Sequence, residues 1–182
     1  MTTTVYYLDT ETTGFDKSDQ VIQIAVIDQS GQTVLSSLLD TEHPIHPKAQ
    51  EVHGISKQVL AGAPRWPDIH DLVAAFLANP NIQVKAYNAA FDLRLMLQTA
   101  LAYDMTIPVL KADCVMQAFA NRYNAGTWVK LTEACRQLGV EVSDLSAHDA
   151  LADAEMTRRL DLAMKKEDRN YSGGSKIIKS MS

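Results

Sequence analysis

The sequence has few of the features that mark secreted, membrane-bound or metal-stapled proteins. Only two cysteines occur among 182 residues, so neither a disulfide framework nor a cysteine-rich zinc site is expected. No run of ~18 apolar residues is present that would span a bilayer. No basic and apolar leader segment is visible at the start of the chain. We therefore expect a cytoplasmic protein with no membrane partner.

Positive charge is scarce as well. The chain holds 17 Lys and Arg against 22 Asp and Glu, a net charge of −5. Residues 165–182 carry five basic and two acidic side chains, so residues 1–164 carry −8. Proteins that grip long duplex nucleic acid usually show a basic stripe, because counterion release supplies much of their affinity. The acidic body instead favours metal binding, or a short strand end held in a pocket.

Length and composition predict one globular domain. Chains of ~100–200 residues usually form a single domain that buries a core without disulfides. Hydrophobic residues make up 46% of this chain, and we expect the domain to cover residues 1–165. From Lys166 the composition becomes polar, with Gly173, Gly174 and several serines. This change predicts a polar, flexible C-terminal tail over residues 166–182.

Apolar patterning predicts an α/β fold in which strands come first and then alternate with helices. The expected strands are 4–9, 21–27, 33–39, 82–87 and 109–112. The expected helices are 68–77, 91–101, 114–123, 131–138 and 149–164. Residues 40–65 are rich in proline and histidine and predict a loop with a short helical turn. This order predicts a mixed sheet with helices on its faces.

Two carboxylates close the first predicted strand. Asp9 and Glu11 are two residues apart, so in an extended segment they point to the same face. Like charges this close are costly unless a cation lies between them, and a divalent cation with oxygen ligands is a natural solution. A solvated strand end followed by turn residues is the alternative interpretation.

A third carboxylate, Asp92, follows another predicted strand. Asn88 precedes the next helix and is expected to cap it. Asp92 then lies in the first helical turn, where the helix dipole favours a negative charge in any case. Its place just past a strand end is also where α/β sheets gather ligands.

The third cluster, residues 148–154, leaves two arrangements open. On a helix, Asp149 and Asp153 are neighbours four residues apart, whereas His148 and Asp153 are about 140° apart. Helical geometry therefore favours Asp149 as the partner of Asp153. His148 shares the site of Asp153 only if it lies at a non-helical entrance and folds back. Asp149 has an alternative role as an acid that complements the helix dipole.

Taken together, the clusters resemble the histidine-bearing subclass of the DEDD exonuclease family, which includes the proofreading subunit of bacterial replicative polymerases. The three matching segments are Asp9-x-Glu11-x-x-Gly14, Asn88-x-x-Phe91-Asp92 and His148-x-Ala150-x-x-Asp153-Ala154. A fourth, Val52-His53-Gly54-Ile55, resembles the family's substrate-pocket loop. The resemblance spans residues 4 to about 164, with the segments in the family's order.

The resemblance implies a ribonuclease H-like fold with a central five-stranded mixed sheet flanked by helices. It also implies a 3′–5′ exonuclease that releases nucleoside monophosphates from single-stranded DNA or RNA ends. Two Mg²⁺ or Mn²⁺ ions are the implied cofactors. By position in the motifs, the implied metal ligands are Asp9, Glu11, Asp92 and Asp153, and His148 is the implied general base. Asp149 falls at a variable position of the pattern and receives no role.

Further residues of the matching segments are expected to contact the substrate. The backbone and hydroxyls of residues 12–14 are placed to bond the terminal 3′-OH, and Ile55 and Phe91 to pack on the last bases. The expected substrate-binding set is Thr12, Thr13, Gly14, His53, Ile55, Asn88 and Phe91. A core position for Phe91 and a loop hydrogen bond for His53 are the alternatives.

Two positions depart from the commonest family pattern. Tyr87 stands where relatives often have His, and Gln23 where many have Glu. Neither is a metal ligand in the family, so they bear on substrate positioning, and Tyr87 is expected in the core. Two other functions remain open: a proofreading subunit bound to a DNA polymerase or other replication and repair proteins, and an inactive nucleic-acid-binding module. The oligomeric state is not predicted.

Overall fold

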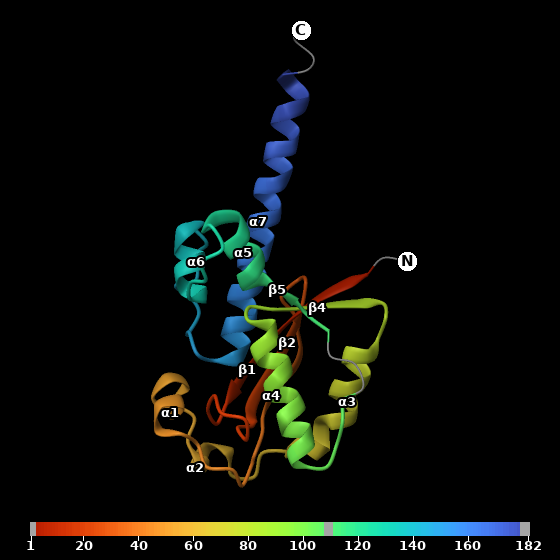
Figure 1. Ribbon diagram of the computed structural model, residues 1–182, viewed down its shortest axis with the longest axis vertical. Coiled ribbons are helices and arrows are strands. Elements are labelled where there is room, and N and C mark those ends of the chain that lie inside the picture. The colour runs from red at the N-terminus through yellow and green to blue at the C-terminus, as the bar shows by residue number, and fades with distance from the viewer. Residues whose placement is uncertain (1–2, 108–110, 179–182) are drawn as a thin grey trace.

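A five-stranded mixed sheet with strand order β3-β2-β1-β4-β5 forms the centre of the structure (Figure 1). The computed structural model describes residues 3–107 and 111–178, with side chains up to residue 168. The strands are β1 (Thr4–Thr12), β2 (Val21–Asp28), β3 (Thr33–Leu38), β4 (Ile82–Ala86) and β5 (Asp113–Cys114). β1 pairs antiparallel with β2 and parallel with β4. The predicted five-stranded mixed sheet is confirmed.

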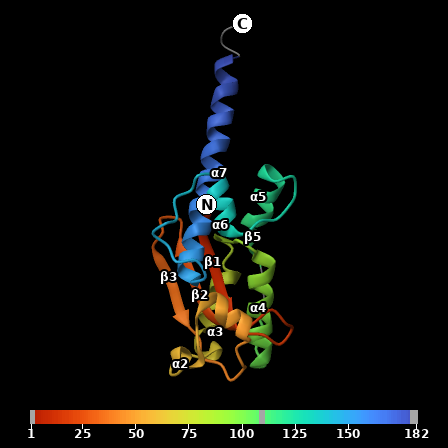
Figure 2. The same ribbon diagram turned by 90° about the vertical axis from the view of Figure 1, so that its left-hand side faces the viewer.

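The strands form where the sequence is richest in β-branched and aromatic residues. β2 is buried along nearly its whole length, which suits a strand covered on both faces and explains its continuous apolar run. β1 begins exposed and becomes buried toward its carboxyl end, where Asp9 and Glu11 lie. Figure 2 shows β3 at one edge of the sheet.

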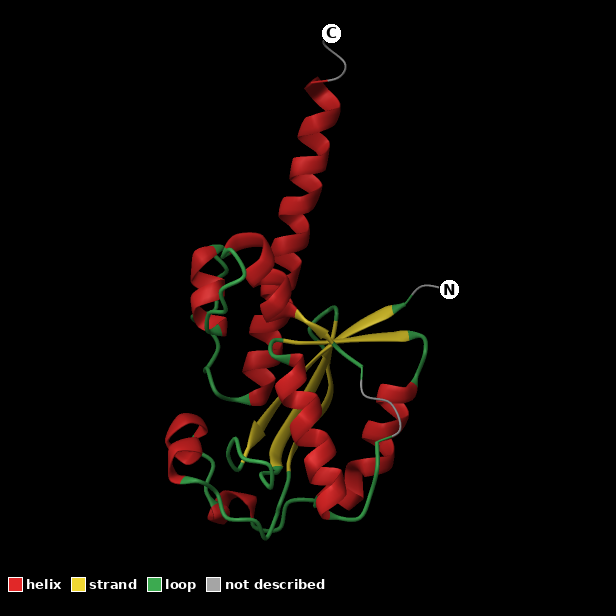
Figure 3. Ribbon diagram, viewed as in Figure 1, coloured by secondary structure: helices red, strands yellow, loops and turns green. Residues whose placement is uncertain are grey.

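Helices cover both faces of the sheet, as the helix and strand colours of Figure 3 make clear. One face packs on α3 (Trp66–Ala78) and α4 (Ala89–Ala102) through a core that includes Leu8, Ile24 and Leu95. The other face packs on α7 (Ala150–Ile178), where Tyr7 and Ile27 meet Ala154. The helices α5 (Val115–Tyr123) and α6 (Leu131–Gln137) pack against α7 in a separate core.

One predicted loop and one predicted strand differ from the structure. The segment 40–65, expected to hold one helical turn, contains α1 (Pro47–His53) and α2 (Lys57–Leu60). Lys111 and Ala112 of the strand expected at 109–112 lie outside a strand, because pairing with the end of β4, at Lys85 and Ala86, is made by β5 at Asp113–Cys114. Residues 109 and 110 of that prediction lie outside the described residues.

The last helix is longer than predicted. An end near residue 164 was expected, whereas α7 continues to Ile178 and extends beyond the rest of the molecule in Figures 1 and 2. Polar Lys, Glu and Arg have good helix propensity, so a polar composition alone does not end a helix. Two contacts also tie this part of α7 to α5: Arg122 pairs with Asp168, and the Tyr123 hydroxyl donates to Glu167 at 2.8 Å. Within the described ranges, every helix is too short or too polar to cross a bilayer.

Candidate active site

The carboxyl ends of two parallel strands bring the predicted acidic residues together. Asp9 and Glu11 end β1, and Asp92 lies in the first turn of α4, which follows the parallel strand β4. Asp153 comes from the start of α7, on the face of the sheet that Asp9 and Glu11 share with Tyr7. They meet in a pocket of about 280 Å³, lined by Asp9, Thr10, Glu11, Thr12, Phe15, Ala49, Val52, His53, Tyr87, Asn88, Phe91, Asp92, Leu131, His148 and Asp153.

Mutual repulsion and burial make this cluster electrostatically unfavourable without a cation. Burial, with smaller contributions from Asp153 and Asp92, raises the pKa of Glu11 to about 8. Burial raises the pKa of Asp92 to about 7, and burial together with Asp92 raises that of Asp9 well above its usual range. In the part of the chain that the structure describes, no Lys or Arg forms an ion pair with any of the four acids.

The donor set at one corner of the pocket suits a divalent cation. Ligand atoms of Glu11, His148 and Asp153 lie within 4.8 Å of one another. Carboxylate oxygens are the ligands that Mg²⁺ and Mn²⁺ prefer, and like charges held this close need a positive partner. The residues present therefore fit a divalent metal centre.

Thr10 holds one of these acids in place and was not predicted. Its hydroxyl donates to Oδ1 of Asp92 at 2.8 Å, which links β1 directly to α4. The hydrogen bond lowers the pKa of Asp92 and offsets part of the effect of burial. Thr10 stands between Asp9 and Glu11 in the sequence and points to the opposite face of β1. The alternation of side chains along a strand shows that Thr10 faces away from Asp9 and Glu11. It does not show that α4 lies on that side, so the contact with Asp92 could not be predicted.

The structure decides between the two arrangements of residues 148–154. α7 begins at Ala150, and His148 lies before it with a left-handed backbone at φ 67°. Its backbone N–H donates to the carboxylate of Asp153, at 3.3 Å from Oδ1 and 3.4 Å from Oδ2. His148 therefore folds back at a non-helical entrance and shares the pocket with Asp153.

Asp149 is the cap of this helix. Its Oδ1 accepts from the backbone N–H of Leu151 at 3.1 Å and of Ala152 at 3.2 Å. A side chain that satisfies two N–H groups of the first turn is a typical N-cap. The Asp149 carboxylate is directed at these N–H groups and at Gln23, and Asp149 is not among the residues that line the pocket.

Four of the seven expected substrate contacts line the pocket: Thr12, His53, Asn88 and Phe91. His53 bridges to β1, with Nε2 3.1 Å from the carbonyl oxygen of Thr12, and burial lowers its pKa. Asn88 occupies the N-cap position of α4 but makes no capping hydrogen bond with its side chain, contrary to prediction. The amide of Asn88 thus remains available in the pocket.

The other three expected contacts lie away from the pocket lining. The Thr13 side chain is fully buried, and its hydroxyl donates to Asp19 at 2.7 Å. Gly14 sits against the same carboxylate, where a side chain would collide with Asp19. Ile55 is buried beside Ile22 and Leu60. The Asp19 carboxylate therefore lies inside the loop that follows β1 and holds its conformation through these contacts.

An aromatic wall formed by Phe15 and Phe91 borders the acids, and the sequence analysis singled out Phe91 but not Phe15. Phe15 is 64% exposed and lies 5.9 Å from the ring of Phe91, centroid to centroid. The Arg94 guanidinium covers the ring of Phe91 at 5.3 Å and donates to the Phe15 carbonyl. Phe15 stands among turn residues in the sequence. An aromatic side chain in such an exposed segment was the one feature that could have indicated a binding role. Tyr87 is buried as expected, but it also lines the pocket.

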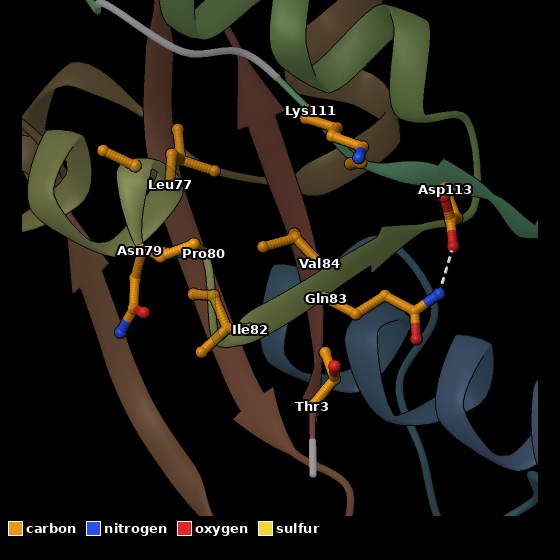
Figure 4. Close-up of a pocket in the computed structure, with 11 residues that line it drawn as sticks. Thr3, Leu77, Asn79, Pro80, Ile82, Gln83, Val84, Lys111 and Asp113 are labelled. Atoms are coloured by element: carbon orange, nitrogen blue, oxygen red, sulfur yellow. Dashed lines mark hydrogen bonds between the residues drawn. The ribbon is translucent and has the colours of Figure 1, made fainter. Parts of the chain in front are cut away.

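A second hollow lies at the opposite end of β4 and lacks such a cluster. Figure 4 shows its lining, with Leu77, Pro80 and Ile82 on one side and Lys111 on the other. Its volume is about 530 Å³, and its amide and carboxylate, Gln83 and Asp113, are hydrogen-bonded to each other. The acids and the histidine thus mark the smaller pocket as the candidate active site.

Comparisons with known proteins identify the family of the chain. The model of the exonuclease family RNase_T matches residues 7–160. An uncharacterized exonuclease of Escherichia phage 186 is 34% identical over 163 residues, which cover 83% of this chain and 82% of that protein. The epsilon subunit of DNA polymerase III from Escherichia coli is 25% identical over 86% of this chain and 69% of its own length.

Solved structures show the same fold. Exonuclease I of E. coli in complex with a dT13 oligonucleotide superposes with a TM-score of 0.75 at 18% identity. The match covers 93% of this chain but 43% of exonuclease I, so the chain spans less than half of that protein. This likeness confirms the predicted ribonuclease H-like fold. With the family match over most of its length and the histidine beside the acids, the chain belongs to the exonuclease family, as a DEDD-type 3′–5′ exonuclease.

Proposed function

We propose that the chain releases nucleoside monophosphates from the 3′ end of single-stranded DNA or RNA, with two divalent metal ions as cofactors. The convergence of four carboxylates and one histidine in a single pocket carries this proposal. Neither the sheet nor its packing requires these side chains, and their burial raises the pKa of several of them.

Asp9, Glu11, Asp92 and Asp153 would hold the metal ions, with Mg²⁺ or Mn²⁺ favoured by an all-oxygen donor set. When bound, two such ions supply a nucleophilic water at neutral pH and stabilise charge on the attacking and leaving oxygens. Asp9 interacts electrostatically with each of the other three acids, so it would be the ligand shared between the ions. Thr10 keeps the Asp92 carboxylate turned toward the pocket through its 2.8 Å hydrogen bond.

His148 would act as the general base. Its side chain is exposed at the rim of the pocket, within reach of Glu11 and Asp153. A neutral imidazole can accept a proton from an attacking water near neutral pH. The left-handed backbone and the bond to Asp153 keep the ring at the entrance of α7 rather than on the helix.

The aromatic wall would receive the last bases of the strand. Stacking on aromatic rings tolerates any sequence, as expected for an enzyme that removes every nucleotide in turn. Phe91 and Phe15 provide two such faces, and Asn88 and the backbone near Thr12 provide polar groups beside them. Exonuclease I of E. coli was solved as a complex with single-stranded DNA, so single-stranded DNA is the first substrate to test.

The proposal is tested with 5′-labelled DNA and RNA strands incubated with Mg²⁺, with Mn²⁺ or with EDTA. Stepwise shortening from the 3′ end in either metal, and none in EDTA, is the expected result. His148→Asn removes the base while keeping a residue that tolerates a left-handed backbone, and it should lower the rate ~10²–10⁴-fold. Undiminished release in EDTA, or by His148→Asn, would contradict the metal mechanism or the role of the histidine respectively.

A proofreading subunit is the second candidate, favoured by similarity to the epsilon subunit and by the projecting α7. We propose residues 166–182 as an accessory segment outside the catalytic domain 1–165, with the cytoplasm as the compartment. A chain that ends at residue 165 should keep its turnover on short oligonucleotides but lose co-elution with a purified replicative polymerase. Collapse of turnover on short oligonucleotides would show instead that the segment belongs to the catalytic unit.

A further inference from the structure

Gln23 links the sheet to the start of the helix that follows His148. It lies on β2 directly opposite Glu11 of β1 and is 9% exposed. Opposed residues of an antiparallel pair point to the same face, here the face that α7 covers. The amide Nε2 donates to Oδ2 of Asp149 at 2.9 Å, and Oε1 accepts from the backbone N–H of Ala150 at 3.2 Å.

A side-chain amide satisfies both partners at once, because it offers both a donor and an acceptor. Asp149 offers a carboxylate, so it needs a donor, whereas Ala150 offers an N–H and needs an acceptor. The first N–H groups of a helix have no partner within the helix. Gln23 satisfies that of Ala150, and Asp149 satisfies those of Leu151 and Ala152. These bonds define where α7 begins and where His148 must leave the helical path.

A different contact anchors the earlier part of the loop that joins α6 to α7, residues 138–149. Arg159 of α7 holds Asp144 through two bonds of 2.7 Å and donates to the Glu141 carbonyl at 2.8 Å. These bonds join the loop to α7 itself. Gln23 instead joins the end of the loop to β2, beside the strand that carries Asp9 and Glu11. Among the described residues, the bond from Gln23 to Asp149 is the only side-chain hydrogen bond between this loop and the sheet.

We propose that Gln23 is a positioning residue for His148. It holds Asp149 and Ala150 at a set place on β2, and thereby places the imidazole over the acids of β1. This inference rests on the proposed role of His148 as general base. Displacement of a catalytic group by about 1 Å can lower a rate ~10²-fold, so a bond one residue away has a measurable effect.

Gln23→Glu is the most informative perturbation because it changes the charge but not the shape of the side chain. The introduced carboxylate faces that of Asp149 and repels it, while the acceptor for Ala150 remains. We expect kcat on a single-stranded DNA oligonucleotide with Mg²⁺ to fall ~10–100-fold. KM should stay within about twofold of wild type, since the acids and the aromatic wall are unchanged.

Asp149→Asn supplies the matched rescue. In the Gln23→Glu background the amide nitrogen introduced at position 149 donates to the carboxylate introduced at position 23, which reverses the direction of the native hydrogen bond. The carbonyl oxygen of the same amide still caps α7. We expect kcat to return to within about threefold of wild type. Gln23→Met, which removes both bonds without adding charge, serves if Gln23→Glu does not fold. It should lower kcat without rescue by Asp149→Asn.

The His148→Asn background distinguishes positioning from general loosening of the fold. If Gln23 acts through His148, Gln23→Glu should change kcat less than about twofold once the imidazole is gone. A full further loss in that background, an unchanged kcat in the single variant, or failure of the rescue would overturn the proposal. Wild-type rates for His148→Asn itself would instead overturn the proposed base, so the two failures are distinguishable.

Discussion

Replacing Asp92 by Asn should stabilise the metal-free protein, and most strongly at alkaline pH. Asp92 is 3% exposed, and burial raises the pKa of its carboxyl from 3.8 to about 7 in the folded protein. A raised pKa means that the folded state binds the proton more tightly than the unfolded state. Ionisation therefore costs folding stability as the pH rises from about 4 to about 7, and the cost is complete above that range.

The magnitude follows from the two pKa values. At about 1.4 kcal/mol for each pKa unit, the cost of a buried ionised Asp92 reaches ~4 kcal/mol at pH 8 and is below ~2 kcal/mol at pH 5. Asn carries no charge and retains an oxygen that can accept from Thr10. Since neighbouring acids adjust their own protonation, we expect a gain of ~2–4 kcal/mol at pH 8 in EDTA. For a chain of this size that raises Tm by roughly 2–4 °C per kcal/mol.

Urea and thermal unfolding in EDTA at pH 5 and pH 8 test this prediction. Asp71→Asn is the matched control, because Asp71 is an exposed helical carboxylate and its replacement should change stability by less than ~0.5 kcal/mol. Saturating Mg²⁺ should close the gap between Asp92→Asn and wild type, because ions that bind the folded state stabilise it. Destabilisation by Asp92→Asn at pH 8, or a gain equal at both pH values, would refute the electrostatic reasoning.

Three further perturbations have defined outcomes. Asp9→Ala should abolish nucleotide release while the circular dichroism spectrum stays that of wild type; near-wild-type release would refute the two-ion proposal. Phe15→Ala should weaken binding of single-stranded DNA by ~1–3 kcal/mol, measured by fluorescence anisotropy in Ca²⁺, and an unchanged Kd would place the strand elsewhere. Asp161→Asn removes the buried partner of Lys85, 2.8 Å away, and should destabilise the fold by ~3–5 kcal/mol in urea unfolding, against no change if the pair is dispensable.

Much of the fold follows from local patterns in the chain. The apolar, β-branched and aromatic runs of β1, β2 and β4 predict these strands to within a few residues, because a strand covered on both faces buries nearly every side chain. The parallel ends of β1 and β4 then bring Asp9, Glu11 and Asp92 together. Spacing within one strand and position after a strand end made these acids candidates, and the resemblance to the exonuclease family selected them as metal ligands.

Only the tertiary structure shows why His148, and not Asp149, shares the pocket with Asp153. Helical periodicity within residues 148–154 favoured Asp149, and the resemblance to the family favoured His148. The choice depends on where α7 begins, and that depends on Gln23, 126 residues away in the sequence. The same holds for Thr10, whose partner Asp92 is 82 residues away, and for Phe15, which faces Phe91 only after folding. Local patterns report what each segment buries, whereas contacts between distant segments set the direction of each polar side chain, because one donor or acceptor can be satisfied by many partners until packing selects one.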